Sequence, residues 1–360
     1  MSRPSGKPGK TIMIMAGGTG GHVFPGLAVA DCLRDRGWGV IWLGSPTGIE
    51  ARLVPSRGYT MAPVNFSGVR GKGLVTLALL PLRLLRAFWQ ALRAMLRHRP
   101  HVVLGMGGYV AYPGGMMAAL LGRPLVVHEQ NSVAGMTNRA LTKVADKVLV
   151  GFPGALPGAV ETGNPVRADI AALPAPQQRF AGRSGPLQIL VVGGSLGAKA
   201  LNDMLPQTLA LMPDAIRPIV RHQAGVQHLE GLKSNYARAG VRGEALAFIE
   251  DMAGAYAAAD LVICRAGALT IAELAAAGVG SVLVPFPHAV DDHQTSNARH
   301  LADAGAAVLL PQSEMTPQGL AQLLQSLDRA RLLDMAGKAR ALARADATER
   351  VAQICAEVAK

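Results

Sequence analysis

MIMAGGTGGHVFP, at residues 13–25, joins a strand pattern to a glycine turn and a helix pattern. The apolar run at residues 12–16 is typical of a buried parallel strand, and Gly17 and Gly18 follow it directly. Strand, glycine turn and helix in this order point backbone N–H groups at an anion. Glycine is needed there because the backbone must approach the ligand without a Cβ in the way. The stretch therefore predicts a phosphate-binding turn.

A second opening of the same kind begins at residues 187–192, LQILVV, which GGSLG follows at residues 193–197. Further strand and helix patterns alternate along the chain, as in layered α/β proteins. Two such openings in 360 residues predict two similar α/β domains with a cleft between them.

Two common nucleotide sites fit these openings poorly. A dinucleotide site needs an acidic residue for the ribose at the end of the second strand. That strand, residues 39–43, is followed by Gly44. Its counterpart at residues 218–220 is followed by Arg221 and His222, so neither strand is followed by an acidic residue. Neither opening carries the Gly-Lys-Ser/Thr of a P-loop. Phosphate recognition remains, while NAD chemistry and ATP hydrolysis are disfavoured.

The composition gives two further expectations. Three cysteines lie far apart in the sequence, which predicts reduced core residues in a cytosolic protein. The formal net charge of +12 predicts an anionic partner. Because aromatic residues make up only 4% and no nucleic-acid motif occurs, an anionic membrane surface or a polyanionic substrate fits better than nucleic acid. The polar first ten residues are expected to form a disordered tail and not a signal peptide.

Residues 81–97 predict a basic amphipathic helix. One stripe carries Arg83, Arg86, Gln90, Arg93 and Arg97, and the neighbouring stripe carries Leu82, Leu85, Trp89, Leu92 and Leu96. Such a helix can lie on an anionic lipid surface. It can equally pack its apolar face on the core and leave the arginines in water. From the residues alone, both interpretations stay open.

Polar or glycine-rich turns follow several strands in the first half of the chain. Residues 105–109 follow the strand at 102–104, and HEQN, residues 128–131, follows the strand at 125–127. Because open α/β sheets bind ligands at the carboxyl ends of their strands, these turns predict one shared site. Residues 162–167 are expected to form the hinge between the domains, and residues 173–185 a linker.

The stretch CRAGALTIAEL, residues 264–274, predicts a helix whose first N–H groups, at Ala268 and Leu269, face a diphosphate. Glu273 is placed to accept hydrogen bonds from a ribose. The alternative is a capping box in which Thr270 and Glu273 only satisfy backbone donors, and the residues alone favour that alternative. Ser195, Gln294 and Arg167 are candidates for the same ligand, with Arg167 supplying a compensating charge.

Together these motifs resemble the MurG family of glycosyltransferases, which act in peptidoglycan synthesis. The matching stretches lie at residues 17–30, 67–73, 102–110, 128–131, 163–167, 191–198, 264–274 and 346–352, and so cover nearly the whole chain. The resemblance implies a GT-B fold, in which two Rossmann-like doubly wound parallel-sheet domains are separated by a deep cleft. It also implies an inverting transfer of N-acetylglucosamine from UDP-GlcNAc to the C4 hydroxyl of lipid I, which gives lipid II.

The resemblance further implies domain roles and substrate-binding residues. Residues 1–10 would be a tail, residues 11–165 with the helix 345–360 would bind the acceptor and the membrane, and residues 166–344 would bind UDP-GlcNAc. With the resemblance, the expected role of Glu273 changes from capping the helix to binding the ribose, or to doing both. The implied substrate-binding residues are Thr19, Gly20, Gly21, Asn131, Arg167, Ser195, Ile249, Ala268, Leu269, Thr270, Ile271, Ala272, Glu273 and Gln294; the acceptor-binding residues are Gly107, Gly108 and Tyr109.

An inverting transfer is a single displacement, so it needs a base for the acceptor hydroxyl. His22 is the first candidate because the positive end of a helix disfavours its protonated form. Binding of a substrate oxygen by His22 is an equally open role, and Glu129 is the second candidate base. Ala268, Leu269, Ser195 and Arg167 would stabilise the leaving diphosphate. No Asp-x-Asp motif accompanies them, so we expect no metal and no other cofactor.

The expected partners are UDP-GlcNAc, lipid I and an anionic membrane surface, bound through the region from Leu74 to Arg97, but not nucleic acid. The resemblance places the protein peripherally on the cytoplasmic face of the inner membrane, within cell-wall and division complexes. Three alternatives remain: a GT-B enzyme with another lipid acceptor, a sugar-nucleotide epimerase, and a non-catalytic module that binds a UDP-sugar. A dehydrogenase is the weakest interpretation, because both expected ribose acids are missing.

Overall fold

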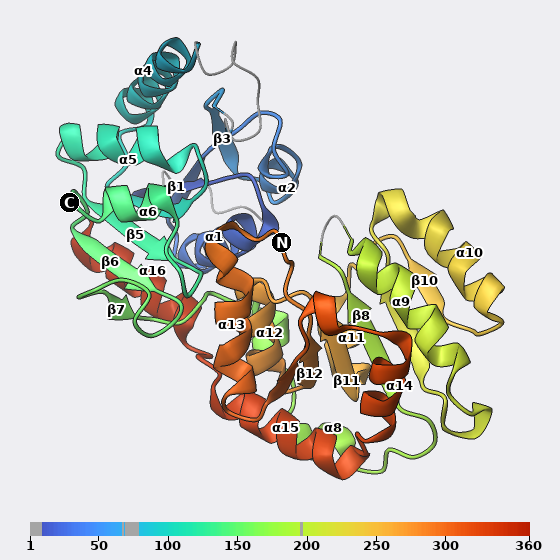
Figure 1. The fold of residues 1–360 in the computed structure, drawn as a ribbon. Coiled ribbons are helices and arrows are strands. Elements are labelled where there is room, and N and C mark those ends of the chain that lie inside the picture. The colour runs from blue at the N-terminus through green and yellow to red at the C-terminus, as the bar shows by residue number, and fades with distance from the viewer. Residues whose placement is uncertain (1–8, 67, 69–78, 195–196) are drawn as a thin grey trace. The chain divides into compact units, whose positions relative to one another are not determined.

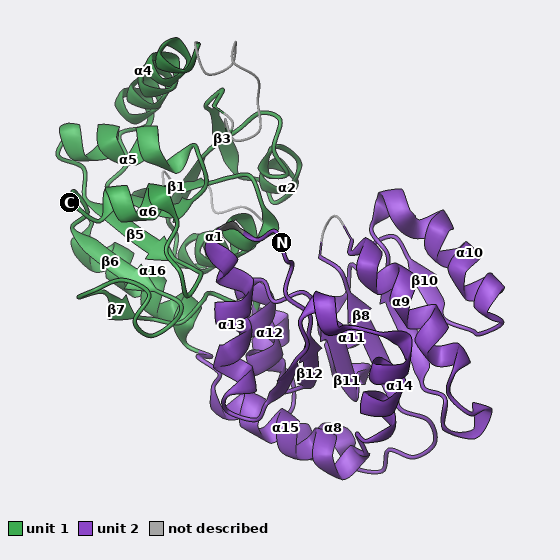
Figure 2. Cartoon of the chain, in the orientation of Figure 1, with its two compact units in different colours: residues 1–167, 346–360 green, residues 168–345 purple. Residues whose placement is uncertain are grey.

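The computed structural model describes residues 9–66, 68, 79–194 and 197–360. Most of the expected tail, Ser195, and the start of the region from Leu74 to Arg97 lie outside the described residues. The chain divides into two compact units (Figure 2). Unit 1 is Met1–Arg167 with Asp346–Lys360, and unit 2 is Ala168–Ala345.

Unit 1 is built on a parallel sheet of seven strands in the order β3-β2-β1-β4-β5-β6-β7 (Figure 1). Its strands are β1 (Thr11–Ala16), β2 (Gly39–Gly44), β3 (Thr60–Pro63), β4 (Val102–Gly107), β5 (Leu125–Glu129), β6 (Lys147–Val150) and β7 (Val160–Glu161). The strand order reverses between β1 and β4, which is where such sheets bind ligands.

Helices cover both faces of this sheet, so β1 is buried on both sides. Ile12 and Ile14 point into one apolar cluster, while Met13 and Met15 point into another. The helices are α1 (Gly20–Asp35), α2 (Glu50–Ser56), α4 (Leu80–His98), α5 (Ala111–Leu120), α6 (Met136–Leu141) and α16 (Ala347–Val358). The last of these returns from the end of the chain and buries Val351, Ala352 and Cys355 against unit 1.

Unit 2 repeats the plan with six parallel strands in the order β10-β9-β8-β11-β12-β13. They are β8 (Gln188–Val192), β9 (Ile219–Gln223), β10 (Glu244–Leu246), β11 (Leu261–Cys264), β12 (Gly280–Leu283) and β13 (Ala307–Leu309). The order reverses between β8 and β11. Two parallel α/β sheets confirm the expected fold class, and the glycine openings both stand at a reversal of strand order.

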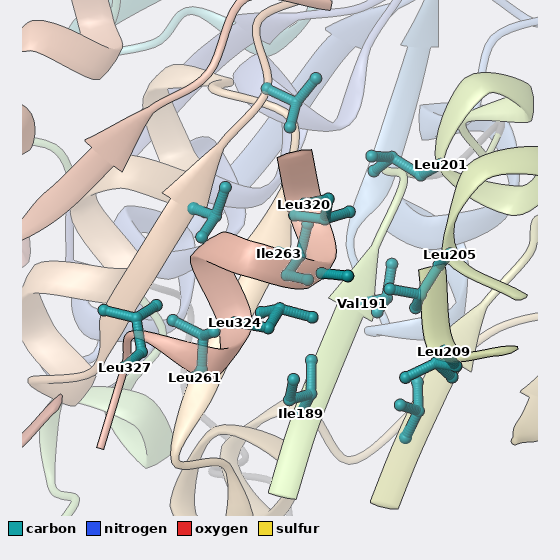
Figure 3. Close-up of a cluster of buried hydrophobic side chains, with 14 of the residues drawn as sticks. Ile189, Val191, Leu201, Leu205, Leu209, Leu261, Ile263, Leu320, Leu324 and Leu327 are labelled. Atoms are coloured by element: carbon teal, nitrogen blue, oxygen red, sulfur yellow. The ribbon is translucent and has the colours of Figure 1, made fainter. Parts of the chain in front are cut away.

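The helices of unit 2 enclose its apolar core. They are α7 (Ala168–Ala171), α8 (Pro176–Phe180), α9 (Lys199–Ala210), α10 (Leu229–Ala239), α11 (Met252–Ala258), α12 (Ala268–Ala277), α13 (His293–Ala302), α14 (Pro317–Gln325) and α15 (Arg329–Ala341). Figure 3 shows part of this core, in which leucines of α9 and α14 gather beside Ile189, Val191, Leu261 and Ile263 of the two central strands. Aliphatic side chains supply nearly all of it.

Two local predictions were wrong. The expected linker at residues 173–185 contains α8, and its Phe180 is buried in the core of unit 2. Arg179 holds the segment in place by donating to the carbonyl oxygens of Ala277, at 2.6 Å, and Tyr256, at 3.2 Å. The apolar run at residues 246–249 predicts a short strand from the sequence, but the strand lies at Glu244–Leu246, because this edge strand pairs only with β9, in a register that begins at Glu244.

Candidate functional site

The carboxyl ends of β1 and β4 approach each other through glycines. Gly107 and Gly108 have φ values of +107° and +83°, which other residues rarely adopt. A Cβ at Gly108 would overlap the carbonyl oxygen of Gly17, and a Cβ at Gly107 would lie 3.0 Å from Cε1 of His22. The structure therefore places the imidazole of His22 against the backbone of Gly107. The neighbouring Tyr109 is half exposed and lies beside Gly68.

Glu50, which the sequence did not single out, anchors the first glycine turn. Its carboxylate is fully buried and accepts from the N–H groups of Gly18, at 3.3 Å, and Ser45, at 3.0 Å. A Cβ at Gly17 or Gly48 would meet this carboxylate. Glu50 therefore ties the turn after β1 to the end of β2. A buried acid in the first turn of a short helix looks like any exposed first-turn acid in sequence.

His22 begins a line of hydrogen bonds that leads into the unit. Its Nδ1 lies 2.6 Å from Oε1 of Gln130, and Nε2 of Gln130 lies 3.0 Å from Nδ1 of His128. Nε2 of His128 lies 3.0 Å from the carbonyl oxygen of Gly163. Burial lowers the pKa of His128 to about 4, so this imidazole is neutral near pH 7. The turn that holds His128 and Gln130 was expected at the site, but no individual role was predicted for either residue.

Glu129, the second candidate base, is almost completely buried, and both of its carboxylate oxygens accept hydrogen bonds from neighbouring residues. Oε1 accepts from the N–H and the side-chain amide of Asn131, at 2.9 and 3.3 Å. Oε2 accepts from the N–H of Gly135, at 3.1 Å, and from Nδ2 of Asn138, at 2.9 Å. Four donors match the capacity of a carboxylate. This geometry favours an anchor that shapes the turn around Asn131 over a base that receives a substrate proton.

Thr19, Gly20 and Gly21 lie where α1 begins. Thr19 is the N-cap residue and has an extended backbone, but its side chain does not cap the helix. The guanidinium of Arg167 lies 5.8 Å from the centre of the Phe24 ring, also on α1. Arg167 thus belongs to unit 1, whereas Ile249, Gln294 and the residues of α12 that were predicted to bind the donor belong to unit 2.

The second glycine turn lies beside the end of β9. Gly197 has a φ of +79°, and a Cβ there would overlap the carbonyl oxygen of Ala224. Nε2 of Gln223 donates to the carbonyl oxygen of Gly194 at 3.0 Å. Ser195, predicted to bind a phosphate in this turn, lies outside the described residues.

Helix α12 begins at Ala268, directly after β11. Its N-cap is Gly267, and none of the described side chains caps it. A capping box would need Thr270 at the N-cap, but Thr270 is the third residue of the helix. The capping interpretation of Thr270 and Glu273 was therefore wrong. Instead, Glu273 is buried in the second turn, where the hydroxyl of Tyr256 donates to it at 3.1 Å.

Gln294 on α13 joins the ends of β11 and β12. Its Oε1 accepts from the N–H groups of Ala266, at 3.2 Å, and Phe286, at 2.9 Å. Nδ2 of the buried Asn297 donates to the carbonyl oxygen of Ala266 at 3.2 Å. The structure thus brings Gln294 next to the residues that lead into α12. Ile249 is buried, as are Ile271 and Ala268 of α12, while Leu269, Thr270 and Ala272 are partly exposed.

Helix α4 turns its large apolar side chains to solvent. Leu85 and Trp89 are 68% and 62% exposed, and Leu82 and Leu96 are similarly exposed. The buried side of the helix consists of Ala87, Ala91, Ala94 and Met95. The interpretation that placed the apolar stripe on the core was wrong, since the small alanines form the packed face. No helix among the described residues combines the length and apolar character needed to cross a bilayer.

Comparison with known proteins gives concordant results. Residues 12–150 match the glycosyltransferase family 28 N-terminal domain, and residues 188–353 match the glycosyltransferase family 28 C-terminal domain. One relative, from Ralstonia nicotianae, is 62% identical to this chain, and the match covers 98% of this chain and 97% of the relative. It is named UDP-N-acetylglucosamine--N-acetylmuramyl-(pentapeptide) pyrophosphoryl-undecaprenol N-acetylglucosamine transferase. Its namesake from Aromatoleum aromaticum is 65% identical, over 97% and 98%. The crystal structure of Acinetobacter baumannii MurG has a TM-score of 0.83 at 45% identity, and covers 97% of this chain and 99% of its own.

Proposed function

This chain belongs to the MurG family of N-acetylglucosaminyltransferases, and from that premise we propose that it transfers N-acetylglucosamine from UDP-GlcNAc to lipid I. The acceptor atom is the C4 hydroxyl of N-acetylmuramic acid, and the product is lipid II. Unit 2 binds the donor, and unit 1 binds the acceptor and the membrane. The strongest support is the N-terminus of α12, which begins at a reversal of strand order and has the buried carboxylate of Glu273 one turn behind it.

The donor's diphosphate binds where α12 begins. The first N–H groups of a helix lack partners within the helix, and the dipole adds a partial positive charge there. The N–H groups of Ala268 and Leu269 bind the phosphates, together with Ser195. Glu273 accepts hydrogen bonds from the ribose hydroxyls, while Ile249 and Gln294 complete the nucleotide pocket. Oriented backbone dipoles stabilise the charge that develops on the departing UDP.

The reaction is one displacement with inversion. The C4 hydroxyl oxygen attacks the anomeric carbon of the donor, and the bond from that carbon to the diphosphate breaks. His22 takes the hydroxyl proton, and UDP leaves with the bonding electrons. Gly107, Gly108 and Tyr109 bind the acceptor, whose diphosphate is placed on the glycine turns of unit 1. Asn131, fixed by Glu129, contributes to the same substrate-binding surface.

A transfer assay tests this function directly. Labelled UDP-GlcNAc and a short-chain lipid I analogue are incubated with the protein, and the product is identified by mass and by enzymatic release of its terminal sugar. A product with β-linked GlcNAc on C4 of the muramyl sugar is the expected result. Binding of UDP-GlcNAc without transfer would overturn the lipid I assignment and favour another GT-B acceptor.

Replacing Glu273 by glutamine is expected to raise the donor KM about ten- to a hundred-fold, while kcat changes much less. The loss corresponds to roughly 1–3 kcal/mol, the cost of weakening a charge-assisted hydrogen bond in a buried site. The measurement is a donor titration at saturating acceptor.

Tyr256→Phe is the matched control, because it removes the hydroxyl that donates to Glu273 and leaves the carboxylate in place. We expect a smaller rise in donor KM in this variant. Equal donor KM values for wild type and Glu273→Gln would contradict a ribose-binding role.

The exposed stripe of α4 binds the anionic membrane surface at the cytoplasmic face, where the lipid tail of the acceptor resides. Leu82, Leu85, Trp89 and Leu96 supply apolar area, and the neighbouring Arg83, Arg86, Arg93 and Arg97 attract anionic headgroups. The protein is therefore peripheral, and its formal charge of +12 is complementary to such a surface. Partners in cell-wall and division complexes would meet it there.

The double variant Leu85→Ser/Trp89→Ser is expected to bind anionic lipid vesicles at least about ten-fold more weakly. Burying a large apolar side chain completely contributes roughly 1.5–3 kcal/mol. Leu85 and Trp89 would each gain part of this free energy when they insert among the lipid headgroups, and each ~1.4 kcal/mol lost weakens binding about ten-fold. Sedimentation with phosphatidylglycerol vesicles measures the partition.

Leu211→Ser is the control, since Leu211 is 49% exposed but lies in unit 2. Unchanged vesicle binding in the double variant, with Leu211→Ser also unchanged, would remove α4 from the membrane contact.

A further inference from the structure

We propose that Gln130 is a positioning residue that fixes the tautomer of His22, so that Nδ1 carries the proton and Nε2 carries the lone pair. The proposal rests on the proposed function insofar as His22 is the base. It assigns a specific atom, Nε2 of His22, to the acceptor hydroxyl. It follows from four hydrogen bonds, two of which end on backbone carbonyl oxygens that can only accept.

The orientation of the Gln130 side-chain amide is the first step. One end of this amide lies 2.8 Å from the carbonyl oxygen of His128. A carbonyl oxygen can only accept, so the amide nitrogen must stand at that end. The reversed amide would set two acceptor oxygens against each other. The oxygen Oε1 is therefore the end that lies toward His22.

The ring of His128 supports the same orientation independently. Its Nε2 is 3.0 Å from the carbonyl oxygen of Gly163, which also only accepts, so Nε2 carries the proton. Nδ1 of this neutral ring then accepts the second N–H of the Gln130 amide, at 3.0 Å. Both amide hydrogens of Gln130 are thus used. Burial lowers the pKa of His128, which keeps the ring in the neutral form that this arrangement requires.

His22 completes the chain. Its Nδ1 lies 2.6 Å from Oε1 of Gln130, and because that oxygen only accepts, Nδ1 must donate. A neutral imidazole with a proton on Nδ1 has its lone pair on Nε2. Donation runs in one direction, from His22 through Gln130 and His128 to the backbone of Gly163. A Cβ at position 107 would lie 3.0 Å from Cε1 of His22, so the glycine leaves room for the ring in this position.

The chain uses an amide where many hydrolases use a carboxylate. Glutamine accepts from Nδ1 without adding a negative charge, so it orients the imidazole without adding a charge that would favour its protonated form. Gln130 is itself held firmly. It is almost completely buried, and Nδ2 of Asn164 donates to its backbone carbonyl oxygen at 2.9 Å. Because Gln130 is fixed in this way, its Oε1 can hold the imidazole of His22 in one orientation.

The proton position is measured by ¹⁵N spectroscopy on protein labelled at its nine histidines, in the neutral form and without substrate. The signals of His22 are assigned as those missing from His22→Ala. We expect the wild type to show a protonated Nδ1 and an unprotonated Nε2. A proton on Nε2 of His22 would overturn the proposal, whether or not the protein transfers a sugar to lipid I.

Gln130→Met tests the consequence for the reaction. Methionine keeps the length of the side chain but does not offer the amide's hydrogen bonds, so the His22 proton is expected to distribute over both nitrogens. We expect kcat to fall about 10–10³-fold with the donor KM unchanged, since part of the base's contribution is lost. An unchanged tautomer or an unchanged kcat would overturn the positioning role.

Gln130→Glu is the companion variant, because it retains an acceptor oxygen opposite Nδ1 of His22. We expect it to keep the proton on Nδ1, even though its second oxygen now faces the carbonyl oxygen of His128 and destabilises the fold. Loss of that Nδ1 proton in folded Gln130→Glu would also contradict the proposal. These spectra need no turnover, so they separate a failure of the tautomer assignment from a failure of the proposed function.

Discussion

Alanine at position 22 is expected to lower kcat about 10²–10⁴-fold, the usual contribution of a positioned general base. The side chain stands at the first turn of α1, against Gly107 and hydrogen-bonded to Gln130, so the substitution removes the base and leaves its surroundings intact. Steady-state transfer to the short-chain lipid I analogue measures the effect. The donor KM should change little, because unit 2 holds the donor.

His22→Gln distinguishes the two roles of this residue. A glutamine retains polar atoms for binding a substrate oxygen but is not a base near neutral pH. Activity close to wild type in His22→Gln, or a loss confined to the acceptor KM, would make His22 a binding residue. Matching losses of kcat in His22→Ala and His22→Gln would support the base.

Gly197→Ala is expected to lower the free energy of unfolding by roughly 2–5 kcal/mol. The positive φ costs about 1–2 kcal/mol for any residue with a Cβ, and overlap with the carbonyl oxygen of Ala224 adds roughly 1–3 kcal/mol. Urea unfolding, followed by circular dichroism, measures the stability. Because the turn lies in the proposed diphosphate site, the affinity for UDP should fall as well.

Gly194→Ala is the matched control within the same turn. Gly194 has a φ of +83°, close to the +79° of Gly197, but a Cβ there would meet no atom of the described residues within 4 Å. It should therefore cost only the backbone strain. Equal losses in the two variants would show that contact with Ala224 contributes nothing.

Much of the fold could be predicted because parallel strands buried on both faces give uninterrupted apolar runs. Residues 12–16 and 189–192 are such runs, and both precede glycine turns that sit at a reversal of strand order. The short edge strands β3, β7 and β13 escaped prediction. They have few residues and pair on one side only, so their apolar pattern is weak.

The candidate site was less predictable, because several of its side chains act through burial and hydrogen-bond direction. Glu50 is ordinary in sequence, yet the fold buries its carboxylate under the glycine turn. The capping interpretation of Thr270 failed because the helix begins three residues earlier than that motif requires. The face of α4 was ambiguous, since a stripe of leucines and a stripe of alanines can each form the packed side. Here the alanines form it, which leaves the large apolar side chains exposed.

The return of α16 to unit 1 sets an order for folding during synthesis. Unit 2 is one continuous segment, 168–345, and can complete its core as soon as that segment has emerged from the ribosome. Unit 1 lacks Val351, Ala352 and Cys355 until residues 346–360 follow. Until then, the apolar side of α1 that receives them stays open to water. The unit that is begun first is therefore completed after unit 2, and the nascent chain carries an unfinished apolar surface until residues 346–360 have emerged.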